Sequence, residues 1–151
     1  MSGERLPLPV SAELTARLSH TIEVTPAFFD IDPMDVVWHG HYVKFMELAR
    51  SALMDRLGYG YAAMRDSGFA WPVVDMRLKY VRSALLGQRL KIRARIIEWE
   101  SRLKVDFLIT DADTGQRMTT AYTIQVAVDM ASREMRYVCP SILWEKLGVL
   151  E

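Results

Sequence analysis

The sequence predicts a single α+β domain in which one long helix is wrapped by a five-stranded antiparallel sheet. Two observations lead to this prediction: residues 40–57 repeat apolar side chains at helical spacing, and residues 74–128 repeat them at every second position. The 151 residues suit one domain, and half of them are apolar, which is enough for a packed core. Because the helix is apolar around most of its circumference, we expect the sheet to cover it, so that each buries the other's apolar surface.

The chain is expected to begin with an N-terminal arm, residues 1–18, in which residues 11–18 favour a short helix. A single domain then follows over residues 19–151. Residues 20–25 alternate between polar and apolar side chains, which is typical of a strand. Residues 30–35 combine three aspartates with a proline, and because these residue types interrupt helices and strands, we expect a loop there.

The predicted helix over residues 40–57 has one continuous apolar face. Its members stand at positions i, i+3, i+4, i+7 and i+11: Tyr42, Phe45, Met46, Ala49 and Leu53. Further apolar residues lie on the other faces, so several elements must pack against this helix. Gly58 follows at the position where a C-terminal cap is expected.

A glycine-rich connector, residues 58–68, separates this helix from four segments with a period of two. Such alternation is typical of an antiparallel sheet with one buried face. The positions assigned to that face are Val74, Met76, Leu78 and Tyr80; Leu90, Ile92, Ala94 and Ile96; Leu103, Val105, Phe107 and Ile109; and Met118, Thr120, Tyr122, Ile124, Val126 and Val128. Residues 113–115 predict a turn between the last two strands, and residues 141–147 predict a short closing helix.

The composition excludes several classes of function. The 19 basic and 19 acidic residues give a net charge of 19 − 19 = 0, whereas a general nucleic-acid binder would show a basic excess. One cysteine, Cys139, allows no internal disulfide and no cysteine-based zinc cluster, and it is expected to be structural. No apolar run approaches the roughly 20 residues that span a bilayer, and no signal-peptide core is present. We therefore expect a cytoplasmic domain.

The densest cluster of polar side chains lies between the predicted first strand and the helix. It comprises Asp30, Asp32, Asp35, His39 and His41. Any one of these aspartates taken alone is more often a turn-forming or helix-capping residue. A metal site built from the two histidines and the carboxylates is an alternative, although the spacing fits no metal signature. The chain has no Gly-x-Ser-x-Gly elbow and no phosphate-binding glycine loop.

Residues 30–42, Asp-Ile-Asp-Pro-Met-Asp-Val-Val-Trp-His-Gly-His-Tyr, are followed by Phe-Met-Glu-Leu-Ala-Arg at residues 45–50. This combination resembles the motif of hotdog-fold thioesterases, in particular the 4-hydroxybenzoyl-CoA thioesterase and Tol-Pal-associated acyl-CoA thioesterase group. The resemblance covers roughly residues 20–148. It implies the hotdog fold, hydrolysis of an acyl-CoA or acyl-carrier-protein thioester without a metal or redox cofactor, and a homo-oligomer, a dimer or a tetramer, with its sites at the dimer interface. The exposed edge of a long antiparallel sheet independently favours pairing with a second chain.

The resemblance also implies roles for individual residues. Asp32 matches the catalytic aspartate, which acts on the thioester carbonyl as nucleophile or as general base for water. An amide at the start of the helix, at His39 or Gly40, would polarise the carbonyl oxygen, and the His39 side chain is the second catalytic candidate. The remaining implied substrate contacts are Gly40, Val37, Tyr42 and Arg82.

Two departures from the family pattern are visible. Asp35 stands where the family usually has glycine, so the loop backbone must adopt a conformation that a Cβ tolerates, and a second carboxylate lies near Asp32. Residues 82–88 replace the usual Pro-Ala and Gly-Asp step. Glu47 is an alternative catalytic carboxylate, but we expect it to be structural and to pair with Arg50 or Lys44.

Two other functions remain open at this point. A hotdog dehydratase or isomerase would act on acyl thioesters without hydrolysing them, with His39 paired to Glu47. A non-catalytic acyl-binding protein is the other. The basic residues of the predicted third strand, such as Arg93 and Arg95, are expected to form a solvated sheet face, although such a face would also suit the phosphates of CoA.

Overall fold

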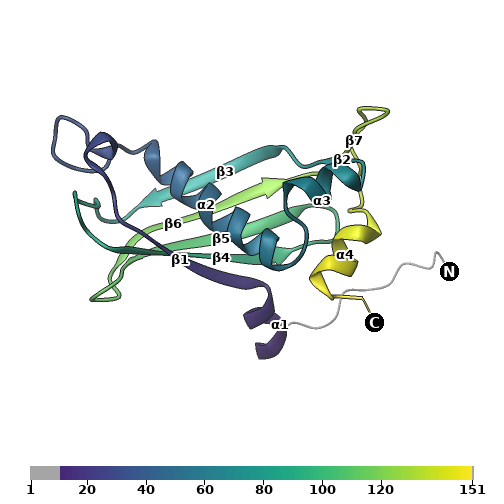
Figure 1. Cartoon of the computed structure of the whole chain (residues 1–151), viewed down its shortest axis with the longest axis horizontal. Helices are drawn as coiled ribbons and strands as arrows, with labels where there is room; N and C mark the ends of the chain where they lie inside the picture. Colours follow the sequence, from purple (N-terminus) through teal and green to yellow (C-terminus); the bar gives the residue numbers. More distant parts are fainter. Residues whose placement is uncertain (1–10, 151) are drawn as a thin grey trace.

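The computed structural model describes residues 11–150, and its main feature is a five-stranded antiparallel sheet packed against one long helix (Figure 1). The spatial order of the strands is β1-β4-β5-β6-β3. Their bounds are Ser19–Val24 for β1, Val73–Tyr80 for β3, Leu90–Glu98 for β4, Leu103–Asp111 for β5 and Arg117–Gln125 for β6. The long helix α2 spans His41–Arg56 and crosses one face of the sheet. The predicted α+β arrangement of one helix against five strands is confirmed.

The smaller elements lie at the ends of this unit. They are α1 (Ala12–Arg17), the 3-10 turn η1 (Phe28–Asp30), α3 (Tyr61–Asp66), the two-stranded pair β2 (Phe69–Ala70) and β7 (Val128–Asp129), and α4 (Ser141–Leu147). The short helices expected at both ends are confirmed, while residues 1–10 of the expected arm lie outside the described residues. Over residues 11–150, every helix is too short or too polar to cross a bilayer.

The core lies between α2 and the sheet. Phe45, Met46, Ala49 and Leu53 of the predicted helix face are all fully buried, and so are the inward residues of β4 and β5. Each large apolar side chain buried in this way contributes about 1.5–3 kcal/mol to folding. The apolar period of residues 40–57 therefore determines which face of α2 meets the sheet.

The predicted face of the last long strand is wrong. Antiparallel pairing with β5 places Thr119 opposite Ile109 and Ala121 opposite Phe107, so the threonine side of β6 faces the core. Ile124 is also buried, on the other face opposite Lys104, so apolar residues on both faces obscured the period. The polar inward side is partly satisfied by Arg50, whose Nη1 donates to Thr123 Oγ1 at 3.3 Å.

The same strand is also shorter than expected. β6 ends at Gln125, and Val128–Asp129 turns away to pair with Phe69–Ala70. The connector over residues 58–68 is not featureless, because it contains α3. Gly58 ends α2 at φ +78°, the left-handed geometry expected of a glycine cap.

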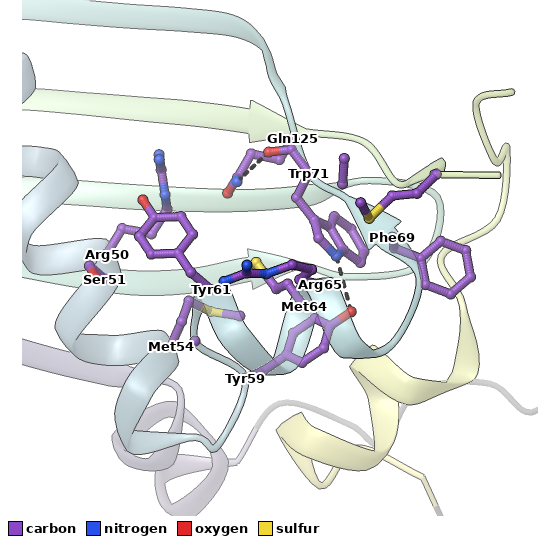
Figure 2. Close-up of a pocket in the computed structure, with 13 residues that line it drawn as sticks. Arg50, Ser51, Met54, Tyr59, Tyr61, Met64, Arg65, Phe69, Trp71 and Gln125 are labelled. Atoms are coloured by element: carbon purple, nitrogen blue, oxygen red, sulfur yellow. Dashed lines mark hydrogen bonds between the residues drawn. The ribbon is translucent and has the colours of Figure 1, made fainter. Parts of the chain in front are cut away.

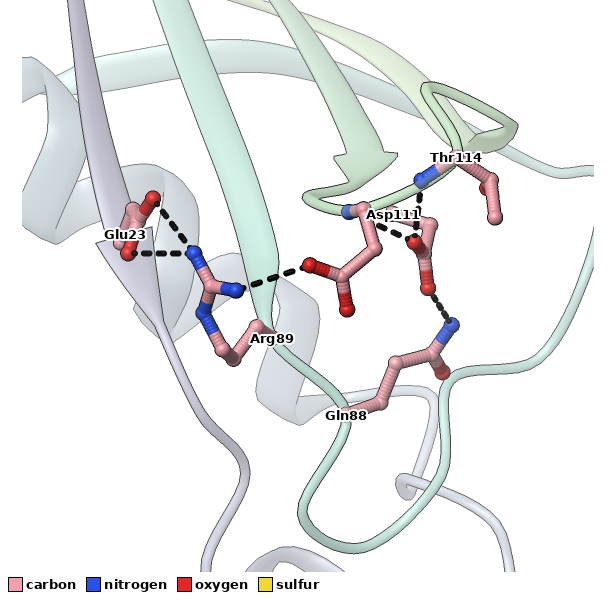
Figure 3. Close-up of polar contacts among 6 residues, drawn as sticks. Glu23, Gln88, Arg89, Asp111 and Thr114 are labelled. Carbon is pink, nitrogen blue, oxygen red and sulfur yellow. Dashed lines mark hydrogen bonds and ion pairs between the residues drawn. The ribbon is translucent and has the colours of Figure 1, made fainter.

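At one end of the sheet, the predicted turn at residues 113–115 is confirmed (Figure 3). The Asp111 carboxylate accepts hydrogen bonds from Gln88 Nε2 at 2.7 Å and from the amides of Thr114 and Asp113 at 2.8 and 2.9 Å. These bonds, the one from Gln88 first, lower the pKa of Asp111 to about 2. The carboxylate thus joins the β5–β6 turn to the segment that leads into β4.

Candidate active site

The candidate site is the loop between β1 and the start of α2. Its two sides are joined by an isolated antiparallel bridge between Ile31 and Val37. The Val37 amide also donates to the carbonyl of Ala84 at 2.9 Å, and the Trp38 amide donates to the carbonyl of Asp30 at 2.9 Å. The backbone therefore holds the loop against both the helix start and the segment that follows β3.

Asp30 is the buried aspartate of this loop, with 3% of its surface exposed. Its carboxylate accepts from the Ala27 amide at 2.9 Å and from Lys44 Nζ, and His41 Nδ1 lies 3.8 Å away. Burial alone would raise the pKa of Asp30, but the hydrogen bonds from Lys44 and Ala27, together with the positive charges nearby, lower it below its ordinary value. Asp30 thus remains ionised and ties the loop to the first turns of α2.

Asp32 has a different environment two residues further on. It is half-buried, and its Oδ1 accepts from the Met34 amide at 2.8 Å. Its backbone closes the turn, because its N–H donates to Val36 and its carbonyl accepts from the Asp35 amide. Over residues 11–150, Oδ2 of Asp32 accepts no hydrogen bond, so this oxygen is available to a substrate or a water molecule.

Asp35 occupies the left-handed region, with φ +63°. This is the backbone conformation that a glycine at this position of the family pattern would adopt freely. Aspartate is one of the few other residues that tolerate it. The expectation that the loop accommodates a Cβ here is confirmed, and the Asp35 side chain is exposed.

The start of α2 presents unpaired amides beside this loop. Neither the His39 nor the Gly40 N–H donates to any group in the described part of the chain, whereas the His41 N–H donates to the Trp38 carbonyl at 2.9 Å. A Cβ on Gly40 would lie 2.3 Å from Cζ3 of Trp38, so the packing of that indole requires glycine. Free N–H groups at the positive end of a helix dipole are suited to stabilise a developing oxyanion.

The other residues predicted for the site have different environments. Tyr42 is 2% exposed, and its hydroxyl oxygen accepts from the Ala84 amide at 2.9 Å. Burial raises the pKa of Tyr42, and the negative charge of Asp32 raises it further. Val37 is a buried core residue, and Arg82 is exposed just beyond β3. The structure therefore gathers the loop, the helix start and Tyr42, while the side chains of Val37 and Tyr42 point into the core.

The structure also shows the surroundings of the His39 and Glu47 side chains. The His39 imidazole is exposed and stacks at a tilt on Trp38, with ring centroids 4.9 Å apart. Both carboxylate oxygens of Glu47 lie 2.5 Å from Nη2 of the buried Arg50, which confirms the expected pairing of Glu47 with Arg50.

Over residues 11–150, no three side chains among His, Cys, Asp and Glu are grouped closely enough to hold a metal ion. Burial raises the pKa of Cys139 to about 12, so this thiol stays protonated at neutral pH.

A cavity of about 420 Å³ lies at the opposite end of α2 (Figure 2). Its walls are mostly apolar and aromatic and come from α2, the connector, the β2 segment, the end of β6 and the turn after β7: Met54, Tyr59, Met64, Phe69, Trp71 and Met130, with Arg50 and Gln125 as polar members. Trp71 Nε1 donates to the Tyr59 hydroxyl at 3.1 Å, and Gln125 Nε2 donates to the Trp71 carbonyl at 2.8 Å. This cavity was not predicted from the sequence, because its lining residues come from five separate segments.

The comparison with protein families gives a direct match, because residues 26–143 fit the Thioesterase-like superfamily. The chain belongs to this superfamily. A Synechocystis protein provisionally named esterase sll0410 is 32% identical to it over 113 residues, which is 74% of this chain and 68% of that protein. The Bacillus subtilis protein provisionally named acyl-CoA thioesterase YneP is 30% identical over 110 residues, or 73% of this chain and 80% of that protein.

Solved structures share the fold of this superfamily member. The crystal structure of Slr0204, a 1,4-dihydroxy-2-naphthoyl-CoA thioesterase from Synechocystis, matches with a TM-score of 0.77 at 20% identity, over 86% of this chain and 96% of that chain. The DHNA-CoA thioesterase from Staphylococcus aureus matches with a TM-score of 0.72 at 23% identity, over 79% of this chain and 80% of that chain. The predicted hotdog fold is confirmed, and so is the predicted class of enzyme, a thioester hydrolase.

Proposed function

We propose that this chain hydrolyses an acyl-CoA thioester to the free acid and the thiol, with Asp32 as the catalytic carboxylate. The observation that supports this most is the combination of an aspartate with an open oxygen and the unpaired amides of His39 and Gly40 at the start of α2. A related protein named as an acyl-CoA thioesterase, and structural neighbours named as DHNA-CoA thioesterases, support a CoA ester as substrate.

The chemistry requires one carboxylate and at least one amide donor. As nucleophile, Asp32 would attack the thioester carbonyl, expel the thiolate and leave an acyl-aspartate that water then cleaves. As general base, it would take a proton from a water molecule that attacks the same carbon. Both routes place negative charge on the carbonyl oxygen, to which the N–H of His39 or Gly40 would donate a hydrogen bond. One such donor typically contributes about 3 kcal/mol to lowering the barrier.

We propose that the apolar cavity at the other end of α2 holds the acyl group of the substrate. This helix has 16 residues, so the cavity and the Asp32 loop of one chain lie on the order of 20 Å apart along its axis. That distance is too long for one small acyl group to reach both within a single chain. A complete site therefore requires a second copy.

The sheet offers the surface for that second copy. β3 is an edge strand, and most of its residues are exposed. Antiparallel pairing of two β3 strands about a two-fold axis would place the Val73 end in one protomer beside the Tyr80 end in its partner. The cavity of each protomer would then face the Asp32 loop of the other. We thus propose a homodimer as the active unit, with a tetramer as a pair of such dimers.

The motif Asp30–Tyr42 further supports membership of the 4-hydroxybenzoyl-CoA and Tol-Pal-associated thioesterase group. We propose that the protein acts in the cytoplasm, on CoA or carrier-protein esters. The dehydratase or isomerase reading receives less support, because Glu47, the carboxylate it would pair with His39, forms an ion pair with Arg50.

The experiment that tests this function follows thioester consumption and thiol release in parallel. The panel contains straight-chain, branched and aromatic acyl-CoAs, and the same acyl groups on a carrier protein. Equal amounts of thioester lost and thiol released support hydrolysis. Thioester converted without thiol release would support a dehydratase or isomerase, and binding without conversion would support an acyl-binding protein.

A further inference from the structure

The last residue of the edge strand β3, Tyr80, contacts the candidate active site. Its hydroxyl donates to the backbone carbonyl of His39 at 2.7 Å. Its ring meets the Tyr42 ring edge-on, with centroids 5.3 Å apart, and 48% of the residue is exposed. A side chain that is half open to solvent thus has its polar end on the turn that begins α2.

The His39 carbonyl that accepts this bond belongs to the same peptide group as a proposed oxyanion donor, the Gly40 N–H. The His39 carbonyl and the Gly40 N–H belong to one planar peptide group, so their orientations are linked. A hydrogen bond to the carbonyl oxygen polarises the peptide and strengthens its N–H as a donor, by roughly 10–30% for each bond in a chain of such bonds. The Gly40 N–H has no partner in the described part of the chain.

We propose that Tyr80 is a positioning residue for the oxyanion site, and that its hydroxyl orients and polarises the His39–Gly40 peptide. This inference rests on the proposed function, in which that peptide faces the thioester carbonyl. It adds a role for a residue that lies outside the motif of residues 30–50.

Other contacts of the turn do not replace this one. The bonds from the Trp38 amide to Asp30 and from the His41 amide to Trp38 hold the adjacent peptides. The Tyr42 hydroxyl accepts from the Ala84 amide instead of donating to the turn. Over residues 11–150, Tyr80 is the one side chain that donates to the His39 carbonyl. Burial, and then the neighbouring Tyr42, raise the pKa of Tyr80, so its hydroxyl keeps its proton at neutral pH.

The variant that tests the inference is Tyr80→Phe, which removes the donor and keeps the ring against Tyr42. We expect kcat to fall about tenfold while KM stays within about twofold, because the bond matters when charge develops on the carbonyl oxygen. Tyr122→Phe is the matched control, since Tyr122 is a half-buried tyrosine of the same sheet that pairs with Arg77 and carries Lys104 Nζ over its ring. This control should retain the kcat of the native enzyme. Sedimentation and thermal unfolding verify that all variants keep the same assembly and fold.

A second readout separates positioning from general damage. A CoA ketone analogue with an isotope-labelled carbonyl reports the polarisation of its C=O bond through its infrared stretching frequency. In the Tyr80→Phe variant this frequency should rise towards the value in solution, while the dissociation constant changes little. A native-like kcat and an unchanged frequency, in an enzyme that still requires Asp32, would overturn this inference alone. Native enzyme without thioester hydrolysis would overturn both this inference and the proposed function.

Discussion

The carboxylates of Asp30 and Asp32 belong to the same loop but have opposite environments. Asp30 is buried and held by Lys44 and the Ala27 amide, whereas Asp32 is half-buried and its carboxylate accepts only from the Met34 amide within the described residues. The hydrogen bonds of the Asp30 carboxylate are made within the protein, whereas one oxygen of the Asp32 carboxylate is left without a partner in the described residues. Asp30 stabilises the loop, and Asp32 is available for chemistry.

This separation predicts that Asp30→Asn lowers stability. The variant loses the charge-assisted bond to Lys44, and such bonds contribute about 1.5–3 kcal/mol. Because the pKa of Asp30 is lower in the folded chain than in the unfolded chain, its contribution is present above the ordinary carboxyl pKa and is lost as pH falls through the folded-state value. Urea unfolding at neutral and acidic pH measures this effect. The two proteins should differ at neutral pH and converge in acid, and an equal gap at both would contradict this role.

The left-handed backbone of Asp35 predicts that Asp35→Gly raises stability. An L-residue with a Cβ loses about 1–2 kcal/mol of stability in this region, while glycine costs roughly 0.5–1 kcal/mol in chain entropy, so a net gain of up to about 1.5 kcal/mol is expected. Asp35→Val, with a branched Cβ, should destabilise the chain. Chemical unfolding of both variants gives the comparison, and a valine variant as stable as the glycine variant would refute the assigned backbone strain.

The proposed composite site predicts complementation between two inactive variants. Asp32→Asn removes the catalytic carboxylate, and Ser51→Trp fills the cavity that Ser51 lines on α2. In a hybrid dimer, the intact Asp32 of one protomer would face the intact cavity of its partner. Co-expression should therefore restore about a quarter of native activity, because half of the dimers are hybrids with one complete site of two. No recovery, with hybrids verified by mass, would mean that each site lies within one chain.

Periodicity was sufficient for most of the fold. The apolar face of residues 42–53 placed α2 against the sheet, and alternation located β3, β4 and β5. It failed for β6, where Thr119 and Thr123 face the core and Ile124 is buried on the opposite side. A strand with buried residues on both faces has no single period for sequence analysis to detect.

The candidate site was likewise predicted from the sequence only in part. The loop with Asp32 was found because its residues are contiguous and follow a family pattern. The cavity and the bond from Tyr80 to His39 join residues distant in sequence, the latter 41 positions apart, so no local pattern could indicate them. Buried pairing also decided the role of Glu47, which spacing alone left between Arg50 and Lys44.

The central claim is that the Asp32 carboxylate performs the hydrolysis. The most direct test uses an acyl-CoA that the native enzyme hydrolyses and compares thiol release by the native enzyme with that by the Asp32→Asn variant. The side-chain oxygen of the asparagine can still accept from the Met34 amide. We expect kcat/KM to fall at least about a hundredfold while the melting temperature stays close to that of the native enzyme. Native-like thiol release by the folded Asp32→Asn variant would contradict it.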